Sequence, residues 1–349
     1  MRVLFEINHP AQVHFFKHLI WDLQRLGHGT LVVTREKDVT LPLLDSLDIP
    51  YHCLSAIGRG RLGMGVELVQ RWAKLLGIAR RFRPDVMMAL TGVSIGLVGR
   101  VLDVPRLVLE EAEHAKLQQM LALPFATRIF TGTGYTKDYG AKQVQFKGVW
   151  VQSYLHPDRF RADPAPLRAA GVDPDSPYII LRTVSWDAAH DVGLRGLSEP
   201  QLREVVTRLS RFGRVLISSE GKLPASLEAH RNPVPVQHMH DLLAYATLYI
   251  GEGGTMAAEA AVLGVPAIFC NSLRVGYLVA LEQLYGLAAN TNSLLEGLPI
   301  AEEWLRRPDL KEQWRQRHAK LMAESEDVTT FMMRLIERTV PGWKQEVRV

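Results

Sequence analysis

Short apolar runs alternate with helix-length amphipathic segments along this 349-residue chain, and this alternation constrains the fold more than any other feature. Runs such as 3–7 and 86–90 have the length and composition of buried strands, whereas 12–26 has the length of a helix. Strands that alternate with helices in this way form parallel sheets covered by helices. The sequence therefore predicts an α/β fold.

Two such series follow one another, and a segment rich in Pro, Asp and Arg, 156–177, is the best linker between them. The predicted strands are 3–7, 30–34, 51–57, 86–90, 106–109, 128–130 and about 144–147, then 178–184, 214–218, 234–237, 248–250, 267–270 and 287–290. A chain of this length exceeds one typical core. We expect two doubly wound Rossmann-like domains facing each other across a cleft, 1–160 and 161–324, with a C-terminal helix at about 325–349 packing back on the first.

Composition is that of an ordinary globular protein, with 47% hydrophobic and 22% charged residues. No apolar run approaches the ~20 residues of a membrane span, and the N-terminal apolar segment is short for a secretory signal. These features predict a cytoplasmic protein. Cys53 and Cys270 stand in apolar runs, where buried, unpaired thiols are expected.

The formal net charge of +4 is dispersed, except in the basic segment 71–83. We interpret this segment as a solvated helix whose Trp72, Leu75, Leu76 and Ile78 face the sheet. The alternative is a basic helix face in peripheral contact with anionic lipid headgroups or an anionic ligand. No zinc-ligand spacing, recognition helix or aromatic RNA-binding motif occurs, so no nucleic-acid partner is expected.

The most informative motif is GEGGTMAAEAAVLGVPAI, residues 251–268, in which a short strand ends in a glycine turn that opens a helix. Gly253 and Gly254 allow close backbone approach, and the helix N-terminus at Thr255 favours an anion such as a diphosphate. Glu259, about one turn further in, is within plausible reach of the hydroxyls of an attached ribose. The alternative is an ordinary strand–helix corner packed through its alanines.

Residues 7–19 follow the first predicted strand and place Asn8, His9 and His14 at a strand end and helix start. A histidine there can shuttle protons or contact substrate oxygens near neutral pH. His14 and His18 share one helix face, but no third ligand stands nearby, so no metal site is expected. The alternative is that one of these histidines caps the helix or belongs to the core.

The segment 87–96, MMALTGVSIG, is another strand that ends in a turn and opens a helix. It has the same predicted order of strand, turn and helix as the motif at 251–268. Gly92 and Ser94 are therefore expected to contact a phosphate or a sugar hydroxyl.

Acidic side chains crowd the end of the fifth predicted strand in LEEAEHA, residues 109–115. Mutual repulsion among Glu110, Glu111 and Glu113, together with partial burial, would raise a carboxyl pKa towards the range of a general base. The alternative is a solvated helix N-terminus, where acidic residues are favoured in any case.

The loop at 181–193, after the first strand of the second half, is long enough to reach over a cleft. It carries Arg182, Ser185 and His190. The guanidinium of Arg182 can pair with a phosphate through two parallel hydrogen bonds.

In 236–246, His238 and His240 bracket a helix start with Met239 between them, and we expect this loop to frame a nucleotide base, with Asp241 as the cap. The segment 58–63, GRGRLG, matches a dinucleotide fingerprint in its glycines only, because no acidic residue follows about 20 positions on. No phosphate-loop motif occurs either. No cofactor is therefore expected, and a nucleotide would enter as part of the substrate.

Two Rossmann-like halves with a strand–glycine–helix–Glu–G-x-P element in the second resemble the GT-B superfamily of nucleotide-sugar enzymes. Its relatives include the MurG-type N-acetylglucosaminyltransferases and the non-hydrolysing UDP-N-acetylglucosamine 2-epimerases. NHPAQVHFFKHL together with GEGGTMAAEAA more specifically resembles an uncharacterised domain-of-unknown-function family within that superfamily. The resemblance spans most of the chain and implies the GT-B architecture.

The resemblance also implies roles in the second half. Glu259 falls where these enzymes hold the nucleotide ribose. Gly253, Gly254 and Thr255 fall where they meet the diphosphate.

In the first half, His14 is similar in position to the histidine of the first glycine-rich loop of MurG-type enzymes. Glu111 and Ala112 resemble a Glu-Ala pair of the epimerases. The loop at 182–191 matches neither relative, and this departure weakens the epimerase interpretation.

These features predict a metal-independent glycosyltransferase that moves a sugar from a nucleotide diphosphate sugar, UDP-linked, to a glycan, lipid or small-molecule acceptor in cell-surface glycan or glycolipid synthesis. His14 or Glu111 would act as general base. A nucleotide-sugar 2-epimerase and a non-catalytic sugar-nucleotide-binding protein are the alternatives. The sequence leaves the sugar, the acceptor and the oligomeric state open.

Overall fold

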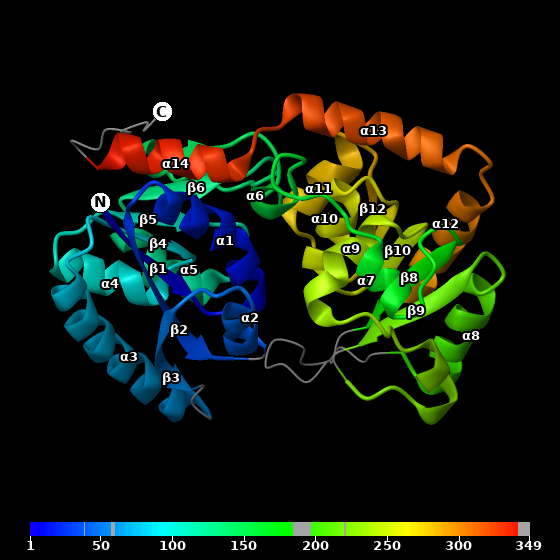
Figure 1. Cartoon of the computed structure of the whole chain (residues 1–349), viewed down its shortest axis with the longest axis horizontal. Helices are drawn as coiled ribbons and strands as arrows, with labels where there is room; N and C mark the ends of the chain where they lie inside the picture. The colour runs from blue at the N-terminus through cyan, green and yellow to red at the C-terminus, as the bar shows by residue number, and fades with distance from the viewer. Residues whose placement is uncertain (38, 57–59, 184–196, 220, 341–349) are drawn as a thin grey trace. The chain divides into compact units, whose positions relative to one another are not determined.

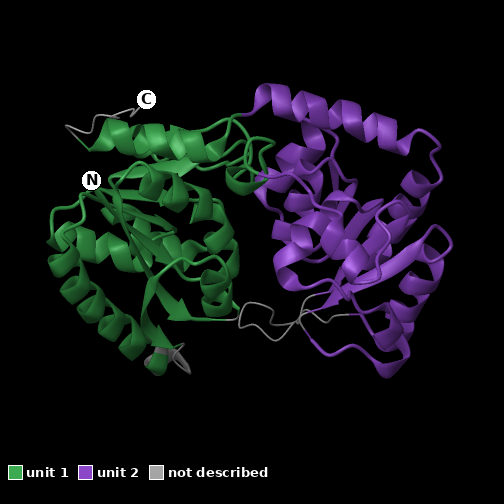
Figure 2. Cartoon of the chain, viewed as in Figure 1, with its two compact units in different colours: residues 1–159, 326–349 green, residues 160–325 purple. Residues whose placement is uncertain are grey.

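The computed structural model describes the whole chain except residues 38, 57–59, 184–196, 220 and 341–349. Two compact units are present: unit 1 is Met1–Arg159 with Glu326–Val349, and unit 2 is Phe160–Ser325 (Figure 2). The predicted domains, 1–160 and 161–324, differ from these units by one residue at each crossing. Each unit is a parallel sheet with helices packed on it, so the predicted α/β fold is confirmed (Figure 1).

Within the described part of unit 1, seven strands form one sheet in the order β3-β2-β1-β4-β5-β6-β7, and every neighbouring pair is parallel. The strands are β1 (Arg2–Ile7), β2 (Gly29–Glu36), β3 (Tyr51–Ala56), β4 (Val86–Leu90), β5 (Arg106–Leu109), β6 (Arg128–Thr131) and β7 (Gln143–Gln145). The strand order reverses direction between β1 and β4. In such sheets, ligands bind beyond the carboxyl ends of the strands at this reversal.

The helices of unit 1 include one from the far end of the chain. They are α1 (Pro10–Arg25), α2 (Thr40–Ser46), α3 (Gly60–Phe82), α4 (Val93–Val101), α5 (Lys116–Ala122), α6 (Gln152–Leu155) and α14 (Val328–Thr339), with short 3-10 turns η1 (Leu123–Phe125) and η2 (Gly140–Lys142). The C-terminal helix α14 packs against α1 and α6 through its buried stripe, which includes Met332 and Ile336 (Figure 1). On α3, Leu75 is buried in the core with Trp72, Leu76 and Ile78 packed around it, as the amphipathic pattern predicted.

Within the described part of unit 2, five parallel strands have the order β12-β11-β10-β8-β9. The strands are β8 (Tyr178–Thr183), β9 (Arg214–Ser219), β10 (Leu248–Gly251), β11 (Ala267–Cys270) and β12 (Ala288–Thr291). The helices are α7 (Ala165–Ala169), α8 (Glu199–Leu209), α9 (Met239–Ala244), α10 (Gly254–Val262), α11 (Gly276–Gln283), α12 (Leu294–Leu305) and α13 (Leu310–Glu324), with 3-10 turns η3 (Ala225–His230) and η4 (Val236–His238). The chain-order reversal falls between β8 and β10, which places a ligand site at the ends of these two strands.

Two local predictions are wrong. The strand expected at 234–237 is replaced by η4, because Pro233 and Pro235 lack the N–H groups that a sheet ladder requires. Cys53 is exposed, although Cys270 is buried as expected. Cys53 lies on the edge strand β3, which pairs with β2 on one side alone among the described strands.

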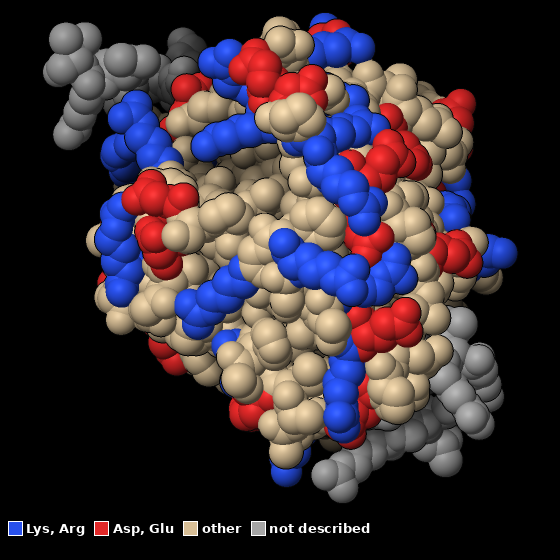
Figure 3. Space-filling view, turned by 90° about the vertical axis from the view of Figure 1, so that its right-hand side faces the viewer, with Lys and Arg blue, Asp and Glu red and all other residues tan. Residues whose placement is uncertain are grey.

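The surface carries both signs of charge. On the face shown in Figure 3, Lys and Arg side chains are interspersed with Asp and Glu, and uncharged surface separates them. Among the described helices, none is both long and apolar enough to cross a membrane.

Candidate functional site

The carboxyl ends of β8 and β10 bring Arg182 against the glycine turn of unit 2. Arg182 is in register with Gly251, and the Glu252 backbone N–H donates to the Arg182 carbonyl oxygen at 3.1 Å. A Cβ on Gly251 would lie 2.5 Å from the Arg182 Cβ and 2.6 Å from its carbonyl oxygen. This position therefore requires glycine, because any side chain would push the two strand ends apart.

The N-cap residue of α10 is Gly253, with φ −87° and ψ 108°, so the N-cap itself has no side chain to cap the helix. The Arg182 side chain runs beside this turn, because a Cβ on Gly253 would lie 3.4 Å from the Arg182 Cγ and 3.8 Å from its Nε. The helix dipole and the guanidinium both favour an anion here. The structure thus brings Arg182, Gly253 and Gly254 together, and Thr255 follows within the first turn of α10.

One feature of this turn opposes an anion. Glu252, between the strand and the helix, is largely buried and carries a carboxylate of the same sign as a phosphate. Arg182 supplies the compensating charge at the same place, and its Nη1 also donates to the Ser218 Oγ at 2.9 Å. The electrostatics of the turn therefore depend on Arg182.

Glu259 lies about one turn into α10 and is only 6% exposed. Its Oε1 is 3.1 Å from the Nε2 of His240 on α9, which is 7% exposed. The ring of Phe160 packs edge-on against the His240 ring, with 6.1 Å between centroids. His240 thus fixes the position of the carboxylate that the sequence assigned to a ribose.

The start of α9 differs from the expected capping pattern. His238 is the N-cap residue and Met239 the first helical residue, without a side-chain cap. The cap predicted for Asp241 is wrong: its Oδ1 accepts from the Asp163 backbone N–H at 2.9 Å, and its Oδ2 is 3.2 Å from the His238 Nδ1. Asp241 stands in the first turn rather than before it, so it reaches the linker segment instead. The predicted residues Ser185 and His190 lie outside the described residues.

In unit 1, the buried carboxylate of Glu6 occupies the N-terminus of α4. Its Oε2 accepts from the backbone N–H groups of Ser94 at 3.2 Å and Ile95 at 3.0 Å, and its Oε1 accepts from the Asn8 Nδ2 at 2.9 Å. The Gly92 N–H is also engaged, by the Leu90 carbonyl oxygen at 2.9 Å. The backbone donors expected to meet a ligand at Gly92 and Ser94 are therefore already satisfied within the protein.

The two histidines of the first loop have different surroundings. His9 is the exposed N-cap of α1, and its Nδ1 accepts from the Ala11 backbone N–H at 3.2 Å. The capping alternative therefore holds for His9. His14, one turn further along α1, is partly buried, and its ring centroid is 5.5 Å from that of Tyr154 on α6.

The acidic cluster after β5 contains two carboxyl groups with strongly raised pKa values. Glu110 is fully buried, and burial raises its pKa to about 7, although hydrogen bonds from the Ala112 N–H and the Gln119 amide favour the charged form. Burial also raises the pKa of Glu111 to about 8, helped by the negative charges of Glu110 and Glu113. The shifts have the predicted direction. The alternative of a solvated helix N-terminus does not fit Glu110, since α5 begins only at Lys116.

A hydrogen-bonded chain connects this cluster to the next loop. The Gln119 Nε2 donates to the Glu110 Oε1 at 3.2 Å, and the Gln119 Oε1 accepts from the Lys137 Nζ at 2.6 Å. Lys137 also donates to the Glu113 carbonyl oxygen at 2.8 Å. The hydroxyls of Tyr135 and Tyr139 are 2.8 Å apart, and burial raises the pKa of both. Among the described residues, no cluster of three or more His, Cys, Asp or Glu side chains is arranged to hold a metal ion.

Sequence reasoning left three features of these sites unassigned: the buried Glu6, the role of Glu110 and the pairing of His240 with Glu259. Glu6 left a signal, because a lone acid within the apolar run RVLFEI must find buried donors. Glu110 was seen as part of the acidic cluster but not assigned a role. The pairing of His240 with Glu259 left no signal, because 19 positions separate them and only the packing of α9 on α10 brings them together.

The comparisons with known proteins agree on the class of fold. A UDP-GlcNAc 2-epimerase from Neisseria meningitidis bound to UDP-GlcNAc superposes with a TM-score of 0.69 and 12% identity, covering 97% of this chain and 100% of that one. A Streptomyces glycosyltransferase complexed with thymidine diphosphate gives a TM-score of 0.64 and 14% identity, covering 96% and 99%. The chain therefore has the GT-B fold, as the sequence predicted.

Sequence comparison adds a family and a relative. Residues 1–148 match the family described as "Protein of unknown function (DUF354)", in agreement with the predicted resemblance. The chain is 25% identical over 257 residues to a UDP-N-acetylglucosamine–N-acetylmuramyl-(pentapeptide) pyrophosphoryl-undecaprenol N-acetylglucosamine transferase of Paenarthrobacter aurescens, which covers 69% of this chain and 68% of that protein. The similar proteins thus include an epimerase bound to UDP-GlcNAc, a glycosyltransferase complexed with thymidine diphosphate and an N-acetylglucosamine transferase.

Proposed function

We propose that this protein is a GT-B glycosyltransferase that binds a UDP-linked sugar in unit 2 and transfers the sugar to an acceptor held by unit 1. One observation carries the proposal: the N-terminus of α10 meets Arg182 at the strand-order reversal of the sheet, and Glu259 lies one turn further in. The sequence similarity to an N-acetylglucosamine transferase supports a transferase over other activities of this fold.

In this proposal the α10 N-terminus and Arg182 bind the diphosphate. When the bond between the sugar C1 and the diphosphate oxygen breaks, negative charge develops on the leaving group. A fixed helix dipole and a guanidinium stabilise that charge without reorganising, and this is why we propose transfer without a metal ion. His238 and Met239 would border the base, and Glu259 would accept hydrogen bonds from the ribose hydroxyls.

The acceptor hydroxyl must lose a proton as it attacks the sugar. We assign this proton to His14 or Glu111, both of which follow carboxyl ends of strands in unit 1. With a pKa of about 8, Glu111 is mostly protonated at pH 7, so its activity as a base would rise with pH through that value. The pH profile of kcat/KM therefore tests Glu111 as the base, because a rise centred near pH 8 is expected if Glu111 takes the proton.

The test of the donor site is UDP binding to Glu259→Ala and Glu259→Gln, measured by calorimetry. Loss of a charged hydrogen-bonding group costs roughly 1.5–3 kcal/mol, which is about 10- to 150-fold in affinity. The glutamine variant preserves packing against His240 and guards against misfolding. Glu303→Ala, an exposed position on α12, is the matched control. UDP affinity equal to the wild type in both Glu259 variants would contradict the donor site.

A second candidate is a nucleotide-sugar 2-epimerase. The specific observation in its favour is Glu111, followed by Ala112, whose raised pKa suits abstraction of a carbon-bound proton. Incubation of UDP-N-acetylglucosamine in deuterated water separates the two, since epimerisation would place deuterium at C2 without any acceptor. Transferase chemistry leaves C2 unlabelled. A non-catalytic binding protein would keep its biological role in His14→Ala and Glu111→Ala but lose it in Glu259→Ala.

A further inference from the structure

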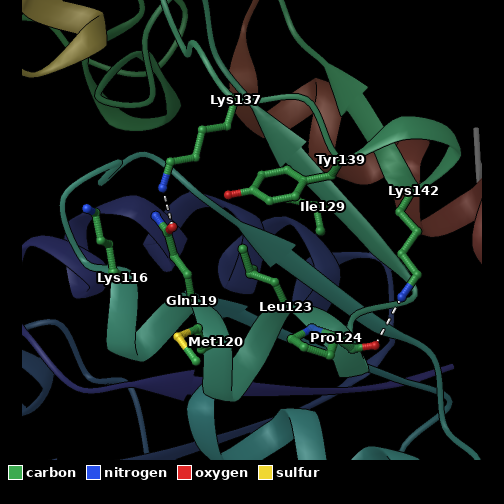
Figure 4. Close-up of a pocket in the computed structure, with 9 residues that line it drawn as sticks. All are labelled: Lys116, Gln119, Met120, Leu123, Pro124, Ile129, Lys137, Tyr139 and Lys142. Carbon is green, nitrogen blue, oxygen red and sulfur yellow. Dashed lines mark hydrogen bonds between the residues drawn. The ribbon is translucent and has the colours of Figure 1, made fainter.

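A cavity in unit 1 lies between α5 and the segment that leads into β7, apart from the donor site. Its volume is about 570 Å³, within the range of small-molecule sites. Its walls are mostly apolar, formed by Met120, Leu123, Pro124 and Ile129. Figure 4 shows these side chains from α5, η1 and β6 turned towards one cavity, with the ring of Tyr139 across it.

Three lysines line the same cavity, whereas none of its described lining residues is an aspartate or glutamate. Lys116 comes from α5, Lys137 from the loop before η2, and Lys142 from η2 itself (Figure 4). An ammonium group has three N–H donors. Lys142 gives one to the Pro124 carbonyl oxygen at 3.0 Å, and the Lys116 ammonium has no hydrogen-bond or ion-pair partner among the described residues. Both lysines are exposed residues, so their ammonium groups border the apolar cavity in contact with solvent and without paired carboxylates.

Lys137 is different, because it already belongs to the acidic cluster. Its ammonium donates to the Gln119 Oε1 and the Glu113 carbonyl oxygen, and it attracts the Glu110 carboxylate, which Gln119 also contacts. These contacts compensate much of its charge. The uncompensated charge at the cavity therefore comes from Lys116 and Lys142.

The apolar surface continues outside the cavity along α5. Leu117 is 70% exposed and Met120 73% exposed, and Leu121 is exposed on the same helix. Residues three and four apart lie on one helix face, so these side chains form a short stripe that runs into the cavity at Met120. A ligand with an apolar chain longer than the cavity would find further apolar contact there.

We propose that this cavity binds a single-chain amphiphilic anion, an apolar chain that carries one phosphate or carboxylate. The apolar walls take the chain, and the anionic group pairs with Lys116 or Lys142, which Figure 4 shows on opposite sides of those walls. An anion pairs with an ammonium group at the edge of the cavity, whereas a neutral amphiphile gains only the apolar contact. This site is argued from unit 1 alone and does not rest on the proposed transferase activity.

The test is calorimetric titration of the full chain with decyl phosphate below its micelle concentration, beside decyl glucoside and inorganic phosphate as separate ligands. We expect decyl phosphate to bind at least ten-fold more tightly than decyl glucoside, and inorganic phosphate to bind more weakly than decyl phosphate. The double variant Lys116→Gln/Lys142→Gln should lose about ten-fold affinity for decyl phosphate and keep its affinity for decyl glucoside. Lys311→Gln, an exposed lysine of α13, is the control.

A second variant tests the apolar part of the cavity. Met120→Glu, at an exposed position that should tolerate the change, places a negative charge at the cavity and should weaken decyl phosphate binding at least as much as the lysine variant. Equal affinity for the phosphate and the glucoside would overturn the proposal, as would wild-type binding in both variants. Binding to phosphatidylglycerol vesicles without binding of monomeric decyl phosphate would also overturn it, in favour of a membrane-facing surface.

Discussion

Two helices in this molecule begin after the same arrangement of strand and glycine turn, but the charged side chains beside their N-termini have opposite signs. Both α4 in unit 1 and α10 in unit 2 follow a short buried strand and a glycine turn. At α4 the carboxylate of Glu6 accepts from the backbone N–H groups of Ser94 and Ile95. At α10 the N-cap residue is Gly253, which has no side chain to cap the helix, and Arg182 runs beside the turn.

The difference comes from the neighbouring strand rather than from the turn. Glu6 is the second-last residue of β1, and Arg182 is the second-last residue of β8. Each is in register with the strand that enters the turn, opposite Ala89 in unit 1 and Gly251 in unit 2. One unit therefore neutralises its helix dipole internally, whereas the other places a cation beside the helix N-terminus, and both charges there favour an anion.

The largest expected effect is from Arg182→Glu, which gives unit 2 the charge that unit 1 has at this place. Loss of a charged hydrogen-bonding partner costs roughly 1.5–3 kcal/mol, and the new carboxylate adds repulsion to that of Glu252. We expect UDP affinity to fall more than about 100-fold in calorimetry. Arg214→Glu, at the opposite end of the sheet, makes the same charge change as a control. Retained UDP affinity in a folded Arg182 variant would remove the anion site.

Glu6→Ala tests whether the α4 N-terminus depends on its internal carboxylate. The change removes three hydrogen bonds of a buried charged group and leaves two backbone N–H groups unsatisfied. We expect the free energy of unfolding to fall by about 2–4 kcal/mol in urea denaturation. Glu36→Ala, at the exposed end of β2, should change it by less than about 0.5 kcal/mol. A Glu6 variant as stable as the control would show that the dipole needs no anion.

Glu110→Gln tests the second set of carboxylates at the same edge of unit 1. Because the pKa of Glu110 is raised to about 7 in the folded protein, the neutral form stabilises the fold below pH 4.5, and this contribution is lost as the pH rises through 7. The glutamine variant keeps this stabilising contribution at high pH, because its side chain does not ionise. We expect the variant to gain about 1–2 kcal/mol over the wild type at pH 8.5 and nothing at pH 4, in denaturation at both values. A stability difference that does not vary with pH would contradict the raised pKa.

The smallest expected effect is from His240→Ala in unit 2. His240 holds Glu259 by one hydrogen bond, so its loss lets the carboxylate adopt positions that miss the ribose. We expect UDP affinity to fall about 3- to 10-fold, which corresponds to roughly 1 kcal/mol. His230→Ala, whose ring contacts a backbone oxygen at β9, serves as the control. A loss as large as that of Glu259→Ala would mean that His240 itself contacts the nucleotide.

Most strands were predictable because buried parallel strands are nearly continuous apolar runs. Residues 86–90 and 267–270 coincide with β4 and β11 to the residue. The strand predicted at 234–237 was wrong, because Pro233 and Pro235 have no N–H group for a sheet ladder. The prediction rested on the apolar residues alone. The prediction that Cys53 is buried was wrong for a related reason. A run can be apolar and still lie on an edge strand, where one face of a residue stays open.

The candidate site was predictable where all of its residues lie in one short stretch of sequence. The glycine turn and Glu259 lie nine residues or fewer apart, so spacing on a helix was enough to propose them. The pairing of Arg182 with Gly251 could not be predicted without the strand order of the sheet. The hydrogen bonds from the Ser94 and Ile95 N–H groups to Glu6 join residues that are 88 and 89 positions apart in the sequence.

By itself the sequence determined the two α/β series, the GT-B resemblance and the glycine turn with its helix, because these depend on hydrophobic period and local backbone preference. Only the tertiary structure decided that a buried carboxylate lies at the α4 N-terminus and a guanidinium beside the α10 N-terminus. That difference depends on the charge that a neighbouring strand places beside the turn. Electrostatic energy depends on distance in space, and the neighbour of a turn in a parallel sheet is set by strand order rather than by position along the chain.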